Sequence, residues 1–304
     1  MMLKDTMLYL AKQDGIRTFV SHNRAARRVA RRFVAGEMLD EAMDVAQALN
    51  REHISVSLDH LGENVSDAAE ASAAARDYIT ILERIGREGA EANISVKLTA
   101  LGLDIGAGLC RENLALVLAR ARDLGIFVRV DMEGTPYTQR TLDLVLDLHR
   151  AYENVGTVLQ SMLHRTPDDA ETLIASGVRV RLVKGAYLEP PSLAFAKKAD
   201  VDRQYIEVMH ALLERGVYPA IATHDEEILA EAKRFAEVHG IKRARFEFQM
   251  LYGIRRDLQE KLAREGYNVR VYVPYGTQWY PYLTRRMAER PANLVFVMSN
   301  ALRG

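Results

Sequence analysis

The feature that most constrains the fold is an alternation, repeated eight times from residue 53 onward, of short β-branched runs with longer amphipathic runs. The predicted strands are His53–Leu58, Asn93–Leu98, Ile126–Asp131, Gly156–Gln160, Val178–Val183, Tyr218–Thr223, Ala244–Gln249 and Asn268–Val273. The predicted helices are Asp67–Arg87, Arg111–Leu124, Tyr137–Tyr152, Pro167–Ala175, Asp200–Arg215, Glu226–Val238, Arg256–Arg264 and Pro281–Arg290. Eight such units without hairpin turns imply parallel strands joined by right-handed crossovers.

This pattern predicts an α/β fold, a distorted (βα)8 TIM-type barrel, because closure removes both edges of the sheet. The competing fold is an open doubly wound sheet, which usually begins with a glycine-rich phosphate turn that no strand here shows. We expect residues 1–52 to form an N-terminal helical arm, with helices beginning at Asn23 and Glu37, and residues 53–304 to form the catalytic barrel. The last helix should lie over the barrel mouth.

The composition limits the kinds of binding partner and the cellular setting that we expect. Lys and Arg together number 41, and Asp and Glu together also number 41. The chain therefore has no net positive charge that would favour binding of nucleic acid. Cys110 is the single cysteine, which argues against a disulfide framework or a cysteine metal cluster and predicts a reducing, cytoplasmic setting. No metal is expected. The sequence contains no apolar run of about 18 residues, so we expect no transmembrane segment.

Polar residues gather where the predicted strands end, and barrel enzymes carry their chemistry at that edge. Lys97 stands out because it lies between Val96 and Leu98 in a strand that should be covered on both faces. It should point into the barrel mouth, where it could bind a ligand, pair with Asp131, or do both.

The last predicted helix adds a second group. In YPYLTRRMAER, Tyr282, Arg285, Arg286 and Glu289 share one helical face. Such charges are common on a solvated helix, but this helix follows the eighth strand and lies near Lys97. Two arginines and a lysine suit a small carboxylate substrate.

Several motifs then resemble those of proline dehydrogenases: SVKLTALG, VDMEGTPYT, RLVKGAYLEPP, ATHD, FEFQMLYG, RVYVPYG and YLTRRMAE. The resemblance runs from about residue 17 almost to the C-terminus. It implies a barrel that binds FAD noncovalently, oxidises L-proline to 1-pyrroline-5-carboxylate and passes the electrons to a quinone. A separate pyrroline-5-carboxylate dehydrogenase would then consume the product.

The resemblance also implies residue roles. Lys97, Arg285 and Arg286 would bind the proline carboxylate, Asp131 would be a catalytic residue that organises Lys97, and Arg181 would stabilise negative charge on the flavin. The remaining substrate contacts would be Glu63, Leu182, Tyr187, Tyr272 and Tyr282, with Glu63 pairing with Arg285 as a gate. The FAD contacts would be Met132, Gln160, Arg181, Val183, Lys184, Gly185, Ala186, Thr223 and His224.

Leu188 stands where bifunctional bacterial enzymes have tryptophan, and the segment between Gly276 and Tyr282 is two residues shorter, which indicates the monofunctional branch. Transfer to quinone requires approach to a membrane. The candidate surface is the basic amphipathic segment NRAARRVARRFVAG, which also fits a simple solvated helix.

Other functions remain open. A Schiff-base lyase or aldolase would use Lys97 or Lys184 as the nucleophile. A non-catalytic barrel could bind a carboxylate, and methylenetetrahydrofolate reductase is a related flavin barrel that needs a nicotinamide and a folate.

Overall fold

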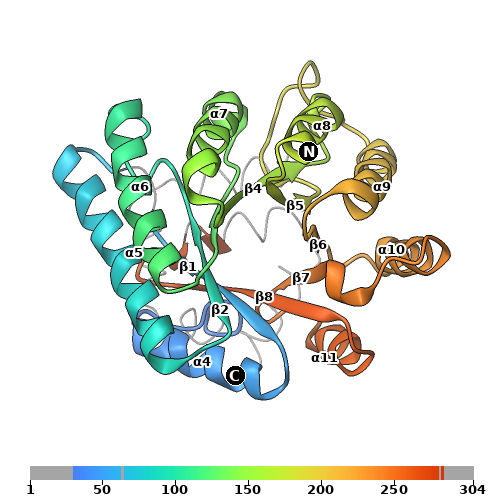
Figure 1. The fold of residues 1–304 in the computed structure, drawn as a ribbon, viewed down its shortest axis with the longest axis horizontal. Coiled ribbons are helices and arrows are strands. Elements are labelled where there is room, and N and C mark those ends of the chain that lie inside the picture. The colour runs from blue at the N-terminus through green and yellow to red at the C-terminus, as the bar shows by residue number, and fades with distance from the viewer. Residues whose placement is uncertain (1–29, 63–64, 281, 284–304) are drawn as a thin grey trace, which may run out of the picture.

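The fold is a closed barrel of eight parallel strands, in a computed structural model that describes residues 30–62, 65–280 and 282–283 (Figure 1). The strands are β1 (Ser55–His60), β2 (Ala92–Val96), β3 (Val128–Val130), β4 (Val155–Gln160), β5 (Arg179–Val183), β6 (Ala220–Ala222), β7 (Glu247–Leu251) and β8 (Asn268–Tyr275). They pair in chain order, and β1 closes the barrel by pairing with β8. The prediction of a (βα)8 barrel is confirmed.

An outer layer of helices covers the strands (Figure 1). The helices are α4 (Leu39–Arg51), α5 (Ala68–Glu88), α6 (Ala107–Asp123), α7 (Thr135–Tyr152), α8 (Thr166–Ala175), α9 (Lys198–Arg215), α10 (Glu226–Val238) and α11 (Arg256–Arg264). Local chemistry sets their ends. The carboxylate of Asp67 caps α5 by accepting hydrogen bonds from the first-turn amides, and Gly89 closes the helix at a φ of 63°.

The distortion of the barrel lies between β8 and β1. Helix α4 packs on these two strands and bridges its neighbours, since Asp40 pairs with Arg84 of α5 at 2.7 Å and Glu52 pairs with Arg256 of α11 at 2.8 Å. It thus takes the place that the helix after β8 would occupy in a regular barrel. The predicted helix at Glu37 begins at Leu39 instead, because the Glu41 carboxylate accepts hydrogen bonds from the amides just before it.

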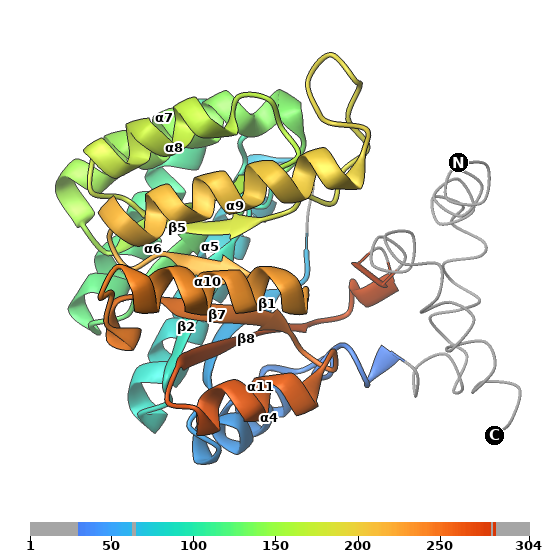
Figure 2. The same ribbon diagram turned by 90° about the vertical axis from the view of Figure 1, so that its right-hand side faces the viewer.

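The chain after β8 turns to the carboxyl-terminal end of the barrel (Figure 2). Residues 279–280 and 282–283 are helical, so the last helix begins before the predicted Pro281. The helical side chains Trp279, Tyr280, Tyr282 and Leu283 are buried in a cluster with Ala30, Val34 and Leu61. Leu61 directly follows β1, which places the start of this helix over the barrel mouth, as expected.

Several strand boundaries differ from the prediction by one or two residues, and the largest difference lies at the start of the seventh strand. The seventh strand was expected from Ala244, but Arg243–Arg245 form a turn of 3₁₀ helix and β7 begins at Glu247. The turn is closed by a hydrogen bond from the Arg245 amide to the Lys242 carbonyl, and its residues are exposed, so local hydrogen bonding replaces strand pairing there.

The barrel interior is polar, whereas TIM barrels usually fill theirs with branched aliphatic residues. Interior positions repeat every second residue along a strand, as Ser57 and Asp59 do in β1 and Arg179 and Arg181 in β5. The buried polar side chains at such positions include Ser57, Asp59, Ser95, Arg129, Gln160, Arg181, Glu247 and Gln249, with Lys97 directly after β2. The aliphatic core instead lies between the strands and the helices.

Candidate active site

The candidate active site is a cluster of charged side chains at the carboxyl ends of the strands, centred on Asp131. Asp131 follows β3, and its Oδ1 accepts a hydrogen bond from Arg181 Nη1 at 2.8 Å. Its Oδ2 accepts one from the hydroxyl of Tyr272 at 2.7 Å and lies 3.9 Å from Lys97 Nζ. One carboxylate therefore holds three of the residues that the sequence assigned to the site.

The short ion pair of Lys97 is with Asp59 of β1, at 2.8 Å, and the Asp131 contact expected from the sequence is the longer of the two. Both partners are buried, with 8% of the Lys97 side chain and 1% of the Asp59 side chain exposed. Asp59 Oδ2 has no hydrogen-bond partner. The lysine charge is thus held at the mouth by a carboxylate whose role the sequence did not reveal.

Arg181 is fixed from several sides. In addition to Asp131, its Nε donates to Gln249 at 2.6 Å, and its Nη2 donates to the hydroxyls of Ser57 and Ser95 at 3.3 and 3.1 Å. Its guanidinium carbon lies 5.2 Å from the centre of the Tyr272 ring. A cation held by this many partners does not need to reorganise when negative charge develops nearby.

Tyr272 and Tyr282 belong to the same region of the barrel mouth. Tyr272 packs against the same buried cluster that contains Tyr282. Burial, and then the neighbouring carboxylates of Asp131 and Asp59, raise the pKa of Tyr272 well above its usual value. The phenol therefore stays protonated and donates its hydrogen bond to Asp131.

The residues after β4 and β5 form a second part of the site. Lys184 Nζ pairs with Asp202 at 2.6 Å and with Asp225 at 2.7 Å. Burial alone would raise the pKa of both carboxyl groups, but the hydrogen bond and charge of Lys184 lower the pKa of each below its ordinary value. Sequence reasoning missed these two carboxylates, although Asp225 belongs to the ATHD motif.

Gly185 needs its backbone freedom. It has a φ of 111°, and a Cβ there would overlap the side chain of Met162. Val183 and Ala186 flank this segment, and Tyr187 packs with Met162, Leu163 and Ala194. The loop is also tied to α7, since the Glu189 carboxylate accepts a hydrogen bond from the Thr135 amide at 2.8 Å.

The other predicted cofactor residues line the neighbouring strand ends. Gln160 is buried and its amide donates to the Glu133 carbonyl at 3.1 Å. Met132 and Thr223 are buried, and His224 Nε2 accepts a hydrogen bond from the Leu251 amide at 3.0 Å. This bond fixes the ring nitrogen that faces the protein and leaves the other nitrogen as the protonated one in a neutral ring.

Some predicted residues do not join the cluster. Leu182 is fully buried in the aliphatic core, and strand alternation places it on the opposite face of β5 from Arg181. Glu63, Arg285 and Arg286 lie outside the described residues. Within the described part of the chain, no group of three His, Cys, Asp or Glu side chains is arranged to hold a metal ion.

The comparisons with known proteins agree on one family. The family model described as proline dehydrogenase matches residues 42–299. The chain is 44% identical over 281 residues to a proline dehydrogenase of Deinococcus radiodurans, with 91% of each chain covered. It is 40% identical over 296 residues to proline dehydrogenase 2 of Bacillus subtilis strain 168, with 97% of each covered. The chain belongs to the proline dehydrogenase family.

Structural comparison extends the proline dehydrogenase match to a larger enzyme. Proline utilization A from Bdellovibrio bacteriovorus, inactivated by N-propargylglycine, superposes with a TM-score of 0.82 at 26% identity. The match covers 93% of this chain but 37% of that one. The predictions of family, enzyme class and barrel fold are confirmed, and Asp131 and its partners lie at the end of the barrel where such folds carry their chemistry.

Proposed function

We propose that this proline dehydrogenase oxidises L-proline to 1-pyrroline-5-carboxylate, with FAD as its cofactor and a quinone as its electron acceptor. The observation that carries the proposal is the cluster of Lys97, Arg181 and Tyr272 around Asp131, at the barrel mouth of a chain in this family. It combines fixed positive charge with an aromatic wall, which is what a small cyclic amino acid requires.

The substrate carboxylate would bind at Lys97. Its ammonium group is held at the mouth by Asp59 and lies near Asp131, so its direction is set before substrate arrives. We propose that Arg285 and Arg286 complete the carboxylate site, and that Glu63 pairs with Arg285 over it. Tyr272 and Tyr282, which share a buried cluster, would flank the proline ring.

The residues at the ends of β4 to β6 fit a flavin in their donor chemistry. Arg181 supplies a buried cation, and Gln160 and Thr223 supply polar groups. Gly185 keeps the backbone free of a side chain beside Met162. We propose that these residues hold FAD together with Met132, Val183, Lys184, Ala186 and His224. When bound, FAD would accept the hydride from proline.

The protein itself would contribute fixed charge and the orientation of the side chains around the substrate. Asp131 holds Arg181 and Tyr272 by short hydrogen bonds, so the three side chains are oriented before the substrate binds. Tyr187 would lie beside the substrate from the loop after β5. Leu182 would support β5 from the helical layer, behind Arg181.

The ion pairs of both candidate lysines count against a Schiff-base mechanism. A nucleophilic lysine must be neutral, and enzymes achieve this by burying it without a carboxylate or beside another cation. Lys97 pairs with Asp59, and Lys184 pairs with Asp202 and Asp225, so each ammonium group lies beside at least one carboxylate.

The proposal also covers the electron acceptor and the location of the protein in the cell. No helix among the described residues is long and apolar enough to cross a membrane. We propose a cytoplasmic enzyme that reaches quinone by transient contact at the inner face of the membrane, with a separate dehydrogenase acting on the product. Of the basic segment of residues 23–36 proposed for that contact, residues 23–29 lie outside the described residues.

The experiment is turnover of L-proline with an artificial electron acceptor by the purified protein and by Lys97→Met. A charged hydrogen bond is worth about 1.5 to 3 kcal/mol, so kcat/KM should fall by about 10- to 150-fold in Lys97→Met. The exposed Lys242 provides the control, since Lys242→Met removes the same charge away from the site. Equal kcat/KM in Lys97→Met and wild type would contradict the proposed carboxylate contact.

A further inference from the structure

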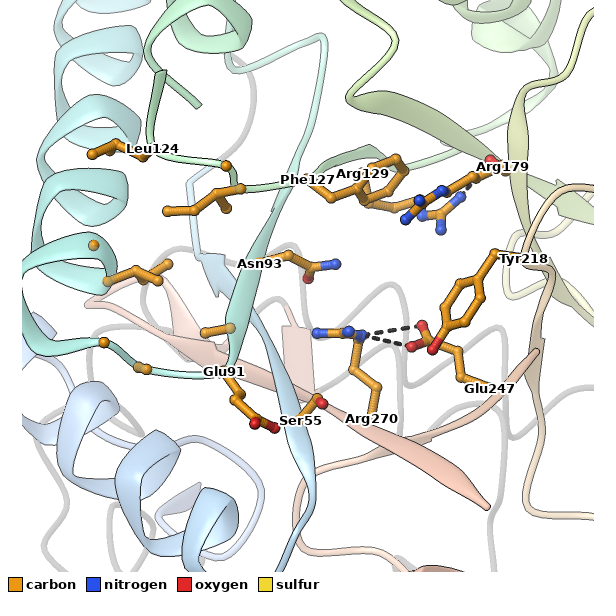
Figure 3. A pocket seen from close by; sticks show the side chains of 17 residues that line it. Ser55, Glu91, Asn93, Leu124, Phe127, Arg129, Arg179, Tyr218, Glu247 and Arg270 are labelled. Carbon is orange, nitrogen blue, oxygen red and sulfur yellow. Dashed lines mark hydrogen bonds and ion pairs between the residues drawn. The ribbon is translucent and has the colours of Figure 1, made fainter. Parts of the chain in front are cut away.

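The opposite end of the barrel contains a second polar cavity. Its volume is about 480 Å³, and its wall includes the amino-terminal parts of the strands (Figure 3). The side chains of Asn93, Arg129, Arg179 and Arg270 project from β2, β3, β5 and β8. Each lies earlier in its strand than the residues around Asp131, so this cavity is separate from the candidate active site.

Counting the charges inside the barrel leaves two cations, Arg129 and Arg179, without an ion pair to any described residue. Three short ion pairs are formed in the interior: Lys97 with Asp59, Arg181 with Asp131, and Arg270 with Glu247 at 3.0 Å. Arg129 is a fourth interior cation and forms no ion pair with any described residue. A buried cation without an ion-pair partner is costly, usually by several kcal/mol.

Backbone carbonyl groups hold the side chain of Arg129 in place. It is 2% exposed, and its Nη1 donates to the carbonyls of Thr157 and Arg179 at 2.9 and 2.6 Å. Its Nε is buried and has no hydrogen-bond partner. Burial, followed by repulsion from Arg181 and Arg270, lowers the pKa of Arg129 well below its usual value, although the charges of Glu247 and Asp131 oppose this shift. Carbonyl oxygens fix the guanidinium in place but do not cancel its charge.

Arg179 adds a second cation at the cavity. Its guanidinium carbon lies 5.0 Å from the centre of the Phe127 ring, and that of Arg129 lies 4.8 Å from the same ring. Arg179 also stacks on Tyr218 at 5.3 Å and, like Arg129, forms no ion pair within the described part of the chain. Stacking on a shared aromatic ring therefore holds these two arginines near each other, in a place where a carboxylate would normally lie between two such cations.

The chain makes room for this arrangement at Gly156. A Cβ at that position would lie 2.9 Å from Arg129 Nη1 and would also collide with the carbonyl of Arg179. Neither carboxylate on the cavity wall forms an ion pair with Arg129 or Arg179. Glu247 is engaged by Arg270, and Figure 3 shows Glu91 on the side away from Arg129 and Arg179.

We infer that this cavity binds a phosphate group, either free phosphate or a small phosphate monoester, between Arg129 and Arg179. Two guanidinium groups without carboxylate partners match the charge of about −1.5 to −2 that a phosphate group carries at neutral pH. Their planar forks suit phosphate oxygens, and the cavity leaves space for a small organic group beyond the phosphate. The site is independent of the proposed oxidation of proline.

The test is a titration of the purified full-length protein with inorganic phosphate, followed by thermal unfolding and calorimetry at constant ionic strength set with chloride. We expect saturable heat of binding and a midpoint that rises with phosphate. Arg179→Gln should weaken phosphate binding at least tenfold. The matched control is Arg245→Gln, because Arg245 is exposed just before β7 at the same end of the barrel and does not line the cavity.

Further binding measurements distinguish the possible ligands of the cavity. Glycerol 3-phosphate binding more tightly than inorganic phosphate would identify a monoester as the ligand, and the reverse order would identify the free ion. Acetate binding as tightly as phosphate, no saturable response, or equal binding by wild type and Arg179→Gln would each overturn the inference. If Arg179→Gln does not fold, Arg179→Lys is the test variant, because it keeps the positive charge and loses the planar guanidinium group. Tenfold weaker phosphate binding by Arg179→Lys supports the site, and unchanged binding refutes it.

Discussion

Removing the charge of Lys97 should destabilise the protein by leaving the Asp59 carboxylate buried alone. Lys97 Nζ supplies the ion pair of Asp59, whose second oxygen already lacks a hydrogen-bond partner and whose side chain is 1% exposed. Breaking a buried pair from one side usually costs about 3 to 5 kcal/mol. We therefore expect Lys97→Met to lose about that much free energy of unfolding, measured by urea denaturation at neutral pH.

A double-mutant cycle separates this effect from lost packing. Asp59→Asn removes the carboxylate charge at nearly constant volume, so the double variant Lys97→Met with Asp59→Asn should recover at least about 1 kcal/mol relative to the sum of the single changes. The control Lys242→Met should change stability by less than about 0.5 kcal/mol. A loss below about 1 kcal/mol in Lys97→Met, or strictly additive effects, would refute the assignment of Asp59 and Lys97 as a buried pair.

Three further perturbations test other parts of the site. Tyr282→Ser should improve turnover of trans-4-hydroxyproline relative to proline, because a bulky phenol against the ring excludes an added hydroxyl; equal discrimination in wild type and variant would count against that contact. Lys184→Met should cost on the order of 2 kcal/mol at neutral pH. Since Lys184 lowers the pKa of Asp202 and Asp225, their contribution is present above about pH 4, the unfolded value, and is lost as pH falls through the lowered values. The deficit measured by denaturation should therefore shrink below about pH 4, and a deficit independent of pH would argue against these ion pairs. Gly185→Ala should cost at least about 1 to 3 kcal/mol because of its φ of 111°, whereas Gly108→Ala, inside α6 with no atom near the new Cβ, should be neutral or stabilising; equal stability of the two variants would contradict the strained backbone at Gly185.

The barrel could be predicted because each local pattern agreed with the global fold. Strand and helix periods alternated eight times, and the order of pairing followed from right-handed crossovers. The boundaries were less accurate where hydrogen bonds with a few neighbouring residues decided them. Glu41 delays the start of α4, and the turn at Arg243–Arg245 delays β7.

The partners of the site residues could not be read from spacing. Asp59 and Lys97 lie 38 positions apart, and their pairing depends on the register of β1 against β2. The contact between Asp131 and Tyr272 spans 141 positions and requires the closed barrel. A signal for the polar interior was nevertheless present, because Ser57 and Asp59, Ser95 and Lys97, and Arg179 and Arg181 alternate with apolar residues in otherwise buried strands.

The cluster around Asp131 and the cavity around Arg129 divide the polar interior between the two ends of the barrel. A chain of hydrogen bonds joins them, from Arg270 through Glu247 and Gln249 to Arg181 and Asp131. These charged side chains of the interior are therefore joined by one continuous chain of hydrogen bonds.

The most direct test of the central claim is the visible absorption spectrum of the purified protein, recorded without oxygen before and after L-proline is added. We predict a flavin band near its usual position in the blue that bleaches when proline is added and recovers when a quinone analogue follows. A protein that stays colourless after FAD is supplied, or a flavin band that proline does not bleach, would contradict the proposed function.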